Sequence, residues 1–303
     1  MIPRSWLFVP ADDPRKLARA RTSGADAVIL DLEDSVVASR KAEARALALE
    51  TLNAPRDALG PDVWVRINPL PGGLADHDLE AIMPGVPDGV VLPKCASGAD
   101  VAALAAKLDA YEELEARMIG APWGHTRILP IATETPGALF ALGSYAQAPS
   151  ARLAGLTWGA EDLSTAVGAE TNRAPDGGYT DLCRLARALC LAGAAAAGVP
   201  AIETIHAAVA DQEALALYAE QGRREGFSGM LAIHPAQVAT INRAFTPSAE
   251  AVERARRIVA LFEADPDAGV LAMDGRMLDA PHLVQARRIL AADAAARNRI
   301  QPP

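Results

Sequence analysis

Cysteine is scarce in this sequence, and membrane-spanning runs are missing. The 303 residues include only Cys95, Cys183 and Cys190, without any CxxC pair. Isolated cysteines in odd number argue against a disulfide framework, and their spacing is not that of a zinc site. No apolar run reaches the length that crosses a bilayer, and the first residues lack the apolar segment of a signal peptide. We therefore expect a soluble, cytoplasmic protein without a membrane partner.

Positive charge is also in short supply. The chain has 29 lysine and arginine residues against 38 aspartate and glutamate residues, which gives a formal net charge of −9. No basic run has the pattern that follows nucleic-acid phosphates, so we expect no nucleic-acid partner. Local basic residues could still bind one phosphorylated ligand. Half of the residues are hydrophobic, which is enough for the core of one large domain or two ordinary ones.

Short apolar runs alternate with helix-like segments along most of the chain. Eight runs have strand character: residues 6–10, 27–30, 63–68, 89–94, 128–132, 153–158, 200–206 and 229–235. This alternation predicts an α/β fold with a parallel sheet, and eight such units are the size of a closed (β/α)8 TIM barrel. An open doubly wound sheet is the second possibility, but no GxGxxG follows the first run.

The pattern changes after the eighth unit. Residues 247–265 have the periodicity of an amphipathic helix, residues 270–282 suit a small hairpin or loop, and residues 282–298 suit a last helix. We predict a catalytic TIM barrel over residues 1–245 and a C-terminal helical extension over residues 246–303. The extension could pack on its own barrel, on a neighbouring subunit, or over the pocket as a lid.

Two acidic residues follow neighbouring strands of the predicted barrel. Glu134 comes after the fifth run and Asp162 after the sixth, and residues 135–147 suit one helix between them. Parallel neighbours place their carboxyl ends on one side, so the two carboxylates could share a divalent cation through hard oxygen ligands. Alternatively, both acids are helix caps. The two residues taken alone leave both possibilities open.

Other polar residues share this placement at the strand ends, where barrel active sites lie. They are Asp31, Glu33, Asp34, Arg66, Asn68, Lys94, Glu203, His206 and His234. Helix caps would account for some of them. Arg66 and Lys94 are harder to explain in this way, because cations are disfavoured at helix N-termini. Residues 164–179 form a long polar connection that could be a lid or an ordinary surface loop.

Several motifs occur together and in a fixed order. They are WLFVPADDP, DAVILDLEDSV, VRINP, VLPK, ATETPGAL, WGAEDL, GMLAIHPAQ and DGRMLDAPHL. From Arg4 to about Leu290, the chain resembles the citrate lyase beta-subunit-like family, the CoA-ester lyases that include malyl-CoA and citramalyl-CoA lyases. The resemblance implies a Mg²⁺-dependent TIM barrel, usually a homo-oligomer (a trimer or hexamer), that makes or breaks a carbon–carbon bond beside a thioester.

The same resemblance implies roles for individual residues. Glu134 and Asp162 match the magnesium ligands of the family. Arg66 matches the arginine that holds a carboxylate or thioester oxygen near the metal. Asp279 matches the catalytic acid/base of the tail, which a neighbouring subunit supplies in family members.

Binding of CoA is implied for a second group of residues. Phe8 and Arg19 match positions that contact the nucleotide portion of CoA. Ile233, His234 and Pro235 resemble the loop that lies along the CoA arm. Two departures from the family pattern, an alanine at position 11 and a glutamate at position 203, could change the packing of the nucleotide or of the rim without touching the metal.

These residues imply an acyl-CoA thioester as substrate. We expect a carbon–carbon lyase that cleaves or forms a β-hydroxyacyl-CoA such as malyl-CoA or citramalyl-CoA by a Claisen-type mechanism. Three alternatives stay open: a citrate lyase beta subunit that acts on a citryl-acyl-carrier-protein thioester, a thioesterase, and a barrel that binds without catalysis.

Overall fold

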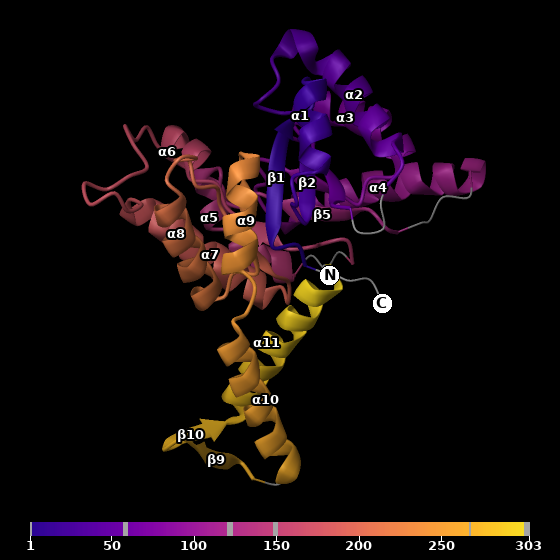
Figure 1. Cartoon of the computed structure of the whole chain (residues 1–303). Helices are drawn as coiled ribbons and strands as arrows, with labels where there is room; N and C mark the ends of the chain where they lie inside the picture. The colour runs from indigo at the N-terminus through magenta and orange to yellow at the C-terminus, as the bar shows by residue number, and fades with distance from the viewer. Residues whose placement is uncertain (1, 57–59, 120–123, 148–150, 267, 300–303) are drawn as a thin grey trace.

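The computed structural model describes residues 2–56, 60–119, 124–147, 151–266 and 268–299. Within these residues an eight-stranded parallel sheet lies at the centre of the molecule (Figure 1). Its strands are β1 (Ser5–Pro10), β2 (Ala27–Asp31), β3 (Asp62–Arg66), β4 (Gly89–Leu92), β5 (Arg127–Pro130), β6 (Leu156–Thr157), β7 (Ala201–Glu203) and β8 (Gly229–Ala232). They are almost entirely buried, which agrees with their short, nearly continuous apolar sequences.

The sheet closes into a barrel. Neighbouring strands follow the order β5-β4-β3-β2-β1-β8-β7-β6, and the two end strands meet through parallel bridges from Ile128 to Leu153 and from Ile131 to Thr157. Across this seam the amide of Ala132 donates to the carbonyl oxygen of Thr157 at 2.8 Å. A closed ring of eight parallel strands is a (β/α)8 barrel. The predicted TIM barrel is therefore confirmed.

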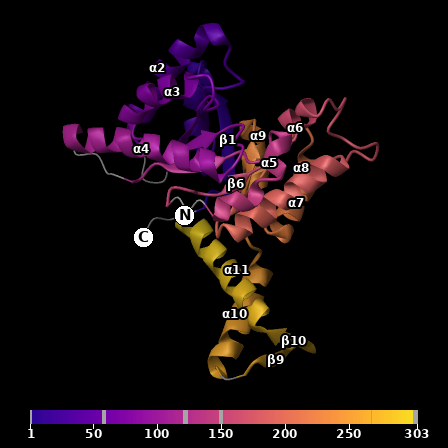
Figure 2. The same ribbon diagram turned by 180° about the vertical axis from the view of Figure 1, so that it is seen from behind.

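Helical segments connect the strands and cover the outside of the barrel, as the two opposite views show (Figures 1 and 2). They are α1 (Pro14–Arg21), η1 (Ala38–Arg40), α2 (Lys41–Asn53), α3 (Leu74–Ile82), η2 (Met83–Gly85), α4 (Gly98–Ile119), α5 (Pro136–Leu139), η3 (Leu142–Ala146), α6 (Glu161–Ala166), α7 (Asp181–Ala196), α8 (Gln212–Glu225) and α9 (Pro235–Ala244), where η marks a 3-10 helix.

Residues 135–147 do not form the single helix that we expected. The chain makes one turn of α-helix, α5, and then the 3-10 helix η3. Gly137 and Gly143 lower the helix propensity of this segment, which explains the break. Asp162 also differs from the expectation, because it lies in the first turn of α6 and not directly at a strand end. Among the described residues, no helix is long and apolar enough to cross a membrane.

Two apolar layers hold the barrel together. Strand residues that point inward form a compact cluster around Trp6 and Trp64, whose rings meet edge to face with centroids 4.9 Å apart. Residues that point outward join the helices in a larger cluster. Gly89 lies in the inner layer, and a Cβ atom there would lie 2.2 Å from the Trp64 ring. Only glycine fits this place without moving the indole.

The extension comprises α10 (Ala249–Ala264), the antiparallel hairpin of β9 (Val270–Met273) and β10 (Arg276–Asp279), and α11 (Ala280–Asn298). It projects away from the barrel, with the hairpin at its far tip (Figure 1). Its small core contains Ala255, Ile258, Met273, Leu278 and Ala286. The extension therefore packs mainly on itself.

Both ends of the extension are attached at the beginnings of the barrel strands. Arg4 donates from Nη1 to Thr246 Oγ1 at 2.9 Å and pairs with Asp26. Arg299, after the end of α11, donates to the backbone oxygen of Asp26 at 3.0 Å and pairs with Asp62 at 3.2 Å. The extension thus leaves and rejoins the barrel at the end opposite the strand carboxyl ends.

We expect Gly89→Ala to destabilise the protein by about 1–3 kcal/mol, because the added methyl group overpacks the barrel interior. Urea denaturation followed by circular dichroism measures this cost. Gly143→Ala is the matched control, since a Cβ atom there would meet nothing within 4 Å. Equal stability of the two variants would contradict the assigned packing of Trp64.

Candidate active site

Arg66 is the last residue of β3, and two carboxylates hold it at the mouth of the barrel. Its Nε and Nη2 atoms donate to the two oxygens of Asp31 at 2.7 and 2.6 Å. Its Nη1 atom lies 2.9 Å from Glu33 Oε2. Both acids are almost fully buried, so the contacts with Asp31 are charge-assisted hydrogen bonds and the contact with Glu33 is an ion pair, all in a region of low dielectric constant. The guanidinium group is thereby fixed in one orientation.

The two carboxylates respond differently to this cation. Burial alone would raise the pKa of Asp31, but the hydrogen bonds and charge of Arg66 outweigh it and lower that pKa. At Glu33 burial dominates over the charges of Arg66 and Lys94, and the pKa is raised. Burial would lower the pKa of Arg66, yet its acidic neighbours raise it instead. Arg66 therefore stays charged at every physiological pH.

Phe8, on strand β1, two strands away from β3, covers the same guanidinium group. The Cζ atom of Arg66 lies 4.8 Å from the centre of the Phe8 ring, a cation–π distance. The sequence implied a CoA contact for Phe8, and the structure places it beside Arg66 at the inner edge of the mouth. Phe8 can therefore contact both Arg66 and a ligand bound above β1.

Lys94 follows β4 and joins this centre to Glu134. It has a φ of +51°, which is uncommon for a residue other than glycine. In this conformation its backbone N–H donates to Glu134 Oε2 at 2.5 Å, while its ammonium group binds Glu33 and lies 3.2 Å from Asp34. Strain of this kind at a barrel mouth is typical of a functional position. Positive φ at a lysine carried no signal in the sequence.

Glu134 and Asp162 share one environment. Glu134 is only 4% exposed. Its pKa is raised well above the ordinary value, first by burial and then by the negative charge of the neighbouring Asp162 and Glu33. Gly159 makes room for this carboxylate, because a Cβ atom there would lie 2.8 Å from Glu134 Cγ. The structure thus brings together the two acids that the sequence paired.

The pair has the chemistry of a magnesium site. Two anionic carboxylates held together in a buried place repel each other, and a divalent cation would remove that repulsion. Among the described residues, no group of three or more His, Cys, Asp or Glu side chains could hold a metal ion. Magnesium commonly takes one or two carboxylates and fills its other positions with water and substrate oxygens, so a pair is sufficient.

Supporting residues behind the mouth were missed in the sequence. The ammonium group of Lys41 donates to the backbone oxygens of Leu32 and Glu33 and to Asn68 Oδ1. Asp78, which is fully buried, accepts from both amides of Asn68. These bonds fix the loop that carries Glu33. Lys41 and Asp78 lie on helices and occur in no motif, so only the fold reveals their role.

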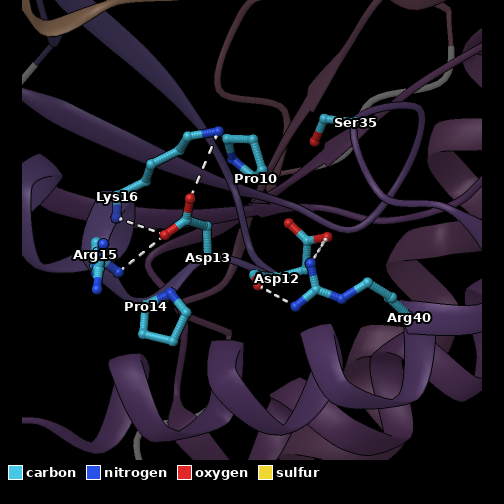
Figure 3. A pocket seen from close by; sticks show the side chains of 8 residues that line it. All are labelled: Pro10, Asp12, Asp13, Pro14, Arg15, Lys16, Ser35 and Arg40. Carbon is cyan, nitrogen blue, oxygen red and sulfur yellow. Dashed lines mark hydrogen bonds and ion pairs between the residues drawn. The ribbon is translucent and has the colours of Figure 1, made fainter.

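A cavity of about 630 Å³ opens above β1 (Figure 3). Its lining consists of Pro10, Asp12, Asp13, Pro14, Arg15, Lys16, Ser35 and Arg40. Arg40 is tied to Asp12 by an ion pair of 2.7 Å, and Asp13 accepts from the first amides of α1. Arg15 and Lys16 add positive charge at the helix N-terminus, a location that favours anions.

None of the residues for which the sequence implied a CoA contact lines this cavity. Arg19 lies one helical turn after Arg15 on α1 and is exposed. Residues 233–235 follow β8, which pairs with β1. His234 has a structural task there, because its Nδ1 atom accepts from the amide of Ala236 at 3.1 Å and caps α9. Ile233 is 39% exposed and faces outward.

Asp279 is not brought to the other predicted residues within this chain. It ends β10 at the tip of the extension, far from the strand carboxyl ends (Figure 1). There it contacts His282, with Oδ1 and Nδ1 2.5 Å apart. Any contact between Asp279 and a barrel mouth must therefore involve a second copy of the chain.

Glu203 does not lie on the rim, where we expected its replacement of aspartate to act. It is fully buried behind β7 and accepts from Trp158 Nε1 at 2.6 Å, Tyr218 OH at 2.8 Å and Arg187 Nε at 2.7 Å. The Trp158 ring in turn packs edge to face on Tyr179 at 5.1 Å. Glu203 thus supports the segment between Trp158 and Tyr179, which contains Asp162.

A (β/α)8 barrel with paired carboxylates and two fixed cations at the strand carboxyl ends defines a barrel enzyme suited to anionic substrates and a divalent metal. The HpcH/HpaI aldolase/citrate lyase family model matches residues 4–235, and the chain belongs to this family. The resemblance seen in the sequence motifs is confirmed. With it, the expectation of a lyase is confirmed, because citrate lyase beta-like members of the family are lyases that act on thioesters.

Individual relatives agree with this assignment. A citrate lyase subunit beta-like protein of Mycobacterium tuberculosis is 35% identical and covers 94% of this chain and 93% of its own. A (3S)-malyl-CoA thioesterase of Cereibacter sphaeroides is 33% identical, with 95% and 93% covered. The crystal structure of CitE from Mycobacterium tuberculosis in complex with magnesium, acetoacetate and coenzyme A matches with a TM-score of 0.76 at 33% identity, covering 96% of this chain and 98% of that one.

We expect Glu134→Gln to stabilise the metal-free protein by about 1 kcal/mol at neutral pH, because the amide removes a buried charge. The pKa of Glu134 is higher in the folded protein than its ordinary value of about 4.5 in the unfolded chain. The wild type therefore loses stability as the pH rises from about 4.5 through the pKa of Glu134 in the folded protein, and the variant does not. Thermal unfolding in EDTA across pH measures this difference.

Magnesium should raise the Tm of the wild type and leave that of Glu134→Gln unchanged. Glu161→Gln, at an exposed neighbouring position, is the control and should behave as the wild type. Identical unfolding curves for wild type and Glu134→Gln at every pH would contradict the electrostatic account of the pair.

Proposed function

We propose that the protein is a Mg²⁺-dependent CoA-ester lyase, which cleaves or forms a β-hydroxyacyl-CoA thioester such as malyl-CoA or citramalyl-CoA by a Claisen-type mechanism. The observation that carries this proposal is the pair formed by the buried Glu134 and the half-buried Asp162 beside Arg66 at the barrel mouth. Family membership supports it, and so do the magnesium, acetoacetate and coenzyme A of the M. tuberculosis CitE complex.

In this mechanism Glu134 and Asp162 would hold the metal. Mg²⁺ bound there would supply Lewis acidity toward the substrate oxygens. Arg66 offsets the negative charge that appears on the enolate or carboxylate oxygen. Asp31 binds its Nε and Nη2 atoms and Glu33 lies 2.9 Å from its Nη1 atom, so the guanidinium group keeps a fixed position for this task.

A proton must leave the substrate hydroxyl group and a proton must reach the carbon of the departing enolate. A carboxylate of Asp279 accepts the first proton as the carbon–carbon bond breaks and returns it to the enolate carbon, so the proton count balances. The products are a 2-oxo acid and an acyl-CoA. Closure of the extension over the mouth would exclude water from the enolate.

The cavity above β1 is the place for the nucleotide end of CoA. Arg15 and Lys16 at the N-terminus of α1 would meet its phosphates, and Arg19 extends the positive side of the same helix. Phe8 and the loop of Ile233, His234 and Pro235 would line the pantetheine arm between this cavity and Arg66.

The position of Asp279 supports a homo-oligomer. Because α10, the hairpin and α11 point away from the mouth of their own barrel, Asp279 would serve the barrel of a neighbouring copy. We propose a trimer or hexamer in which each active site combines a barrel from one chain with a tip from another. This arrangement uses the extension as a catalytic arm.

Relatives with different activities supply the alternatives. One relative is a (3S)-malyl-CoA thioesterase, and another is the citrate lyase subunit beta of Leuconostoc mesenteroides. An assay of the purified protein with Mg²⁺ against malyl- and citramalyl-CoA separates them. A lyase releases a 2-oxo acid and an acyl-CoA, a thioesterase releases free CoA, and a citrate lyase subunit leaves CoA thioesters unchanged.

We expect Asp162→Ala to lower kcat with malyl- or citramalyl-CoA at least about a hundredfold, because a metal contributes several kcal/mol to the transition state. Steady-state kinetics with and without EDTA test this, and circular dichroism checks the fold. Asp181→Ala, at an exposed helix start, is the control. Full activity of Asp162→Ala, or of the wild type in EDTA, would contradict the metal role.

Mixing two inactive variants tests whether Asp279 acts in the active site of a neighbouring chain. Asp162→Ala lacks the metal site and Asp279→Asn lacks the proton carrier, so each homo-oligomer should be inactive. In co-expressed mixtures some sites combine an intact barrel with an intact tip, and part of the activity should return. If the mixture stays as inactive as its components, Asp279 does not act across chains.

A further inference from the structure

Asp279 and His282 form a close pair at the tip of the extension. The Nδ1 atom of His282 lies 2.5 Å from Asp279 Oδ1 and also 3.2 Å from the backbone nitrogen of Asp279, whose N–H points at it. Asp279 ends β10 and His282 lies in the first turn of α11, so both side chains come from rigid elements. The exposed fractions are 37% for Asp279 and 43% for His282.

The short contact between Asp279 Oδ1 and His282 Nδ1 is a hydrogen bond when one proton lies between the two atoms. A neutral imidazole carries that proton in its Nδ1–H tautomer and donates it to the carboxylate, and Nδ1 then does not also accept the backbone N–H. This hydrogen bond fixes Oδ1 of Asp279.

Other groups around His282 do not replace this interaction. Arg254 from α10 and Gln285 from α11 line a cavity of about 200 Å³ with His282, and the rest of that lining is apolar. On the hairpin, Asp279 pairs in register with Val270, which has no charge. Asp279 and Arg254 are therefore the charged residues that face His282 within the described part of the tip.

We propose that His282 is the positioning residue of Asp279: it holds Oδ1 through one shared proton, so that Oδ2 is presented to the neighbouring barrel in a fixed direction. The inference rests on the proposed role of Asp279 as acid/base.

Two substitutions separate positioning from helix capping. His282→Leu removes the contact and should lower kcat about ten- to a hundredfold at every pH, with KM unchanged, because substrate binds on the barrel. His282→Gln can accept the backbone N–H with Oε1 and donate to Asp279 with Nε2, and glutamine is a normal residue at this place in a helix cap. It should retain most of kcat.

The split between kcat and KM and the recovery of kcat in His282→Gln are the decisive readouts. A merely structural role of His282 would lower the Tm of His282→Leu without a selective loss of kcat. Gln285→Leu, in the same cavity but without contact to Asp279 in the structure, is the control, and thermal unfolding verifies that all variants are folded.

Each outcome decides between the two proposals. Unchanged kcat in His282→Leu, or a kcat of His282→Gln as low as that of His282→Leu, overturns the positioning role. If Asp279→Asn abolishes turnover while both His282 variants keep the wild-type kcat, only this inference fails. If Asp279→Asn leaves kcat unchanged, the proposed acid/base role of Asp279 is wrong, and the positioning role of His282 falls with it.

Discussion

Repulsion between two neighbouring carboxylates, one of them buried, is the constraint on which this barrel mouth depends. Burial first, and then the charge of Asp162, raise the pKa of Glu134, and a metal-free fold must compensate for that arrangement. Arg66 contributes an opposite charge near Glu134, and Lys94 connects the carboxylate of Glu134 to that of Glu33. The positive charges of Arg66 and Lys94 thus offset the negative charges of the acids around them. The residues that stabilise this site are also the ones proposed to act in its function.

The barrel explains why these charges meet. Parallel strands end on one side, so residues from β2, β3, β4 and β5 converge although they are far apart in the sequence. Buried charges are tolerated where each has an opposite partner within hydrogen-bond reach, and Arg66 with Asp31 supplies the strongest such pair. The backbone N–H of Lys94 holds the carboxylate of Glu134 in place. The backbone conformation of Lys94 therefore helps to position the charges, in addition to the side chains themselves.

Much of this organisation could be predicted from residue patterns. The eight strands follow from short apolar runs, and the proximity of Glu134 and Asp162 follows from their places after successive strands. The sequence could not reveal what depends on atomic packing: the positive φ of Lys94, the room that Gly159 leaves for Glu134, or the burial of Glu203 behind β7. The break between α5 and η3 was missed because alanine and leucine outnumber the two glycines that end the helix.

The attachment of the extension at both ends has a mechanical consequence. Both ends of the extension are attached to one end of the barrel, through Arg4 with Thr246 and through Arg299 with Asp62. The extension is therefore held at two points and does not hang from a single flexible connection. One added residue in α10 would rotate the hairpin by about 100° about the helix axis and swing the tip sideways. Insertions or deletions in this arm should therefore be tolerated only as near-whole turns matched in both helices.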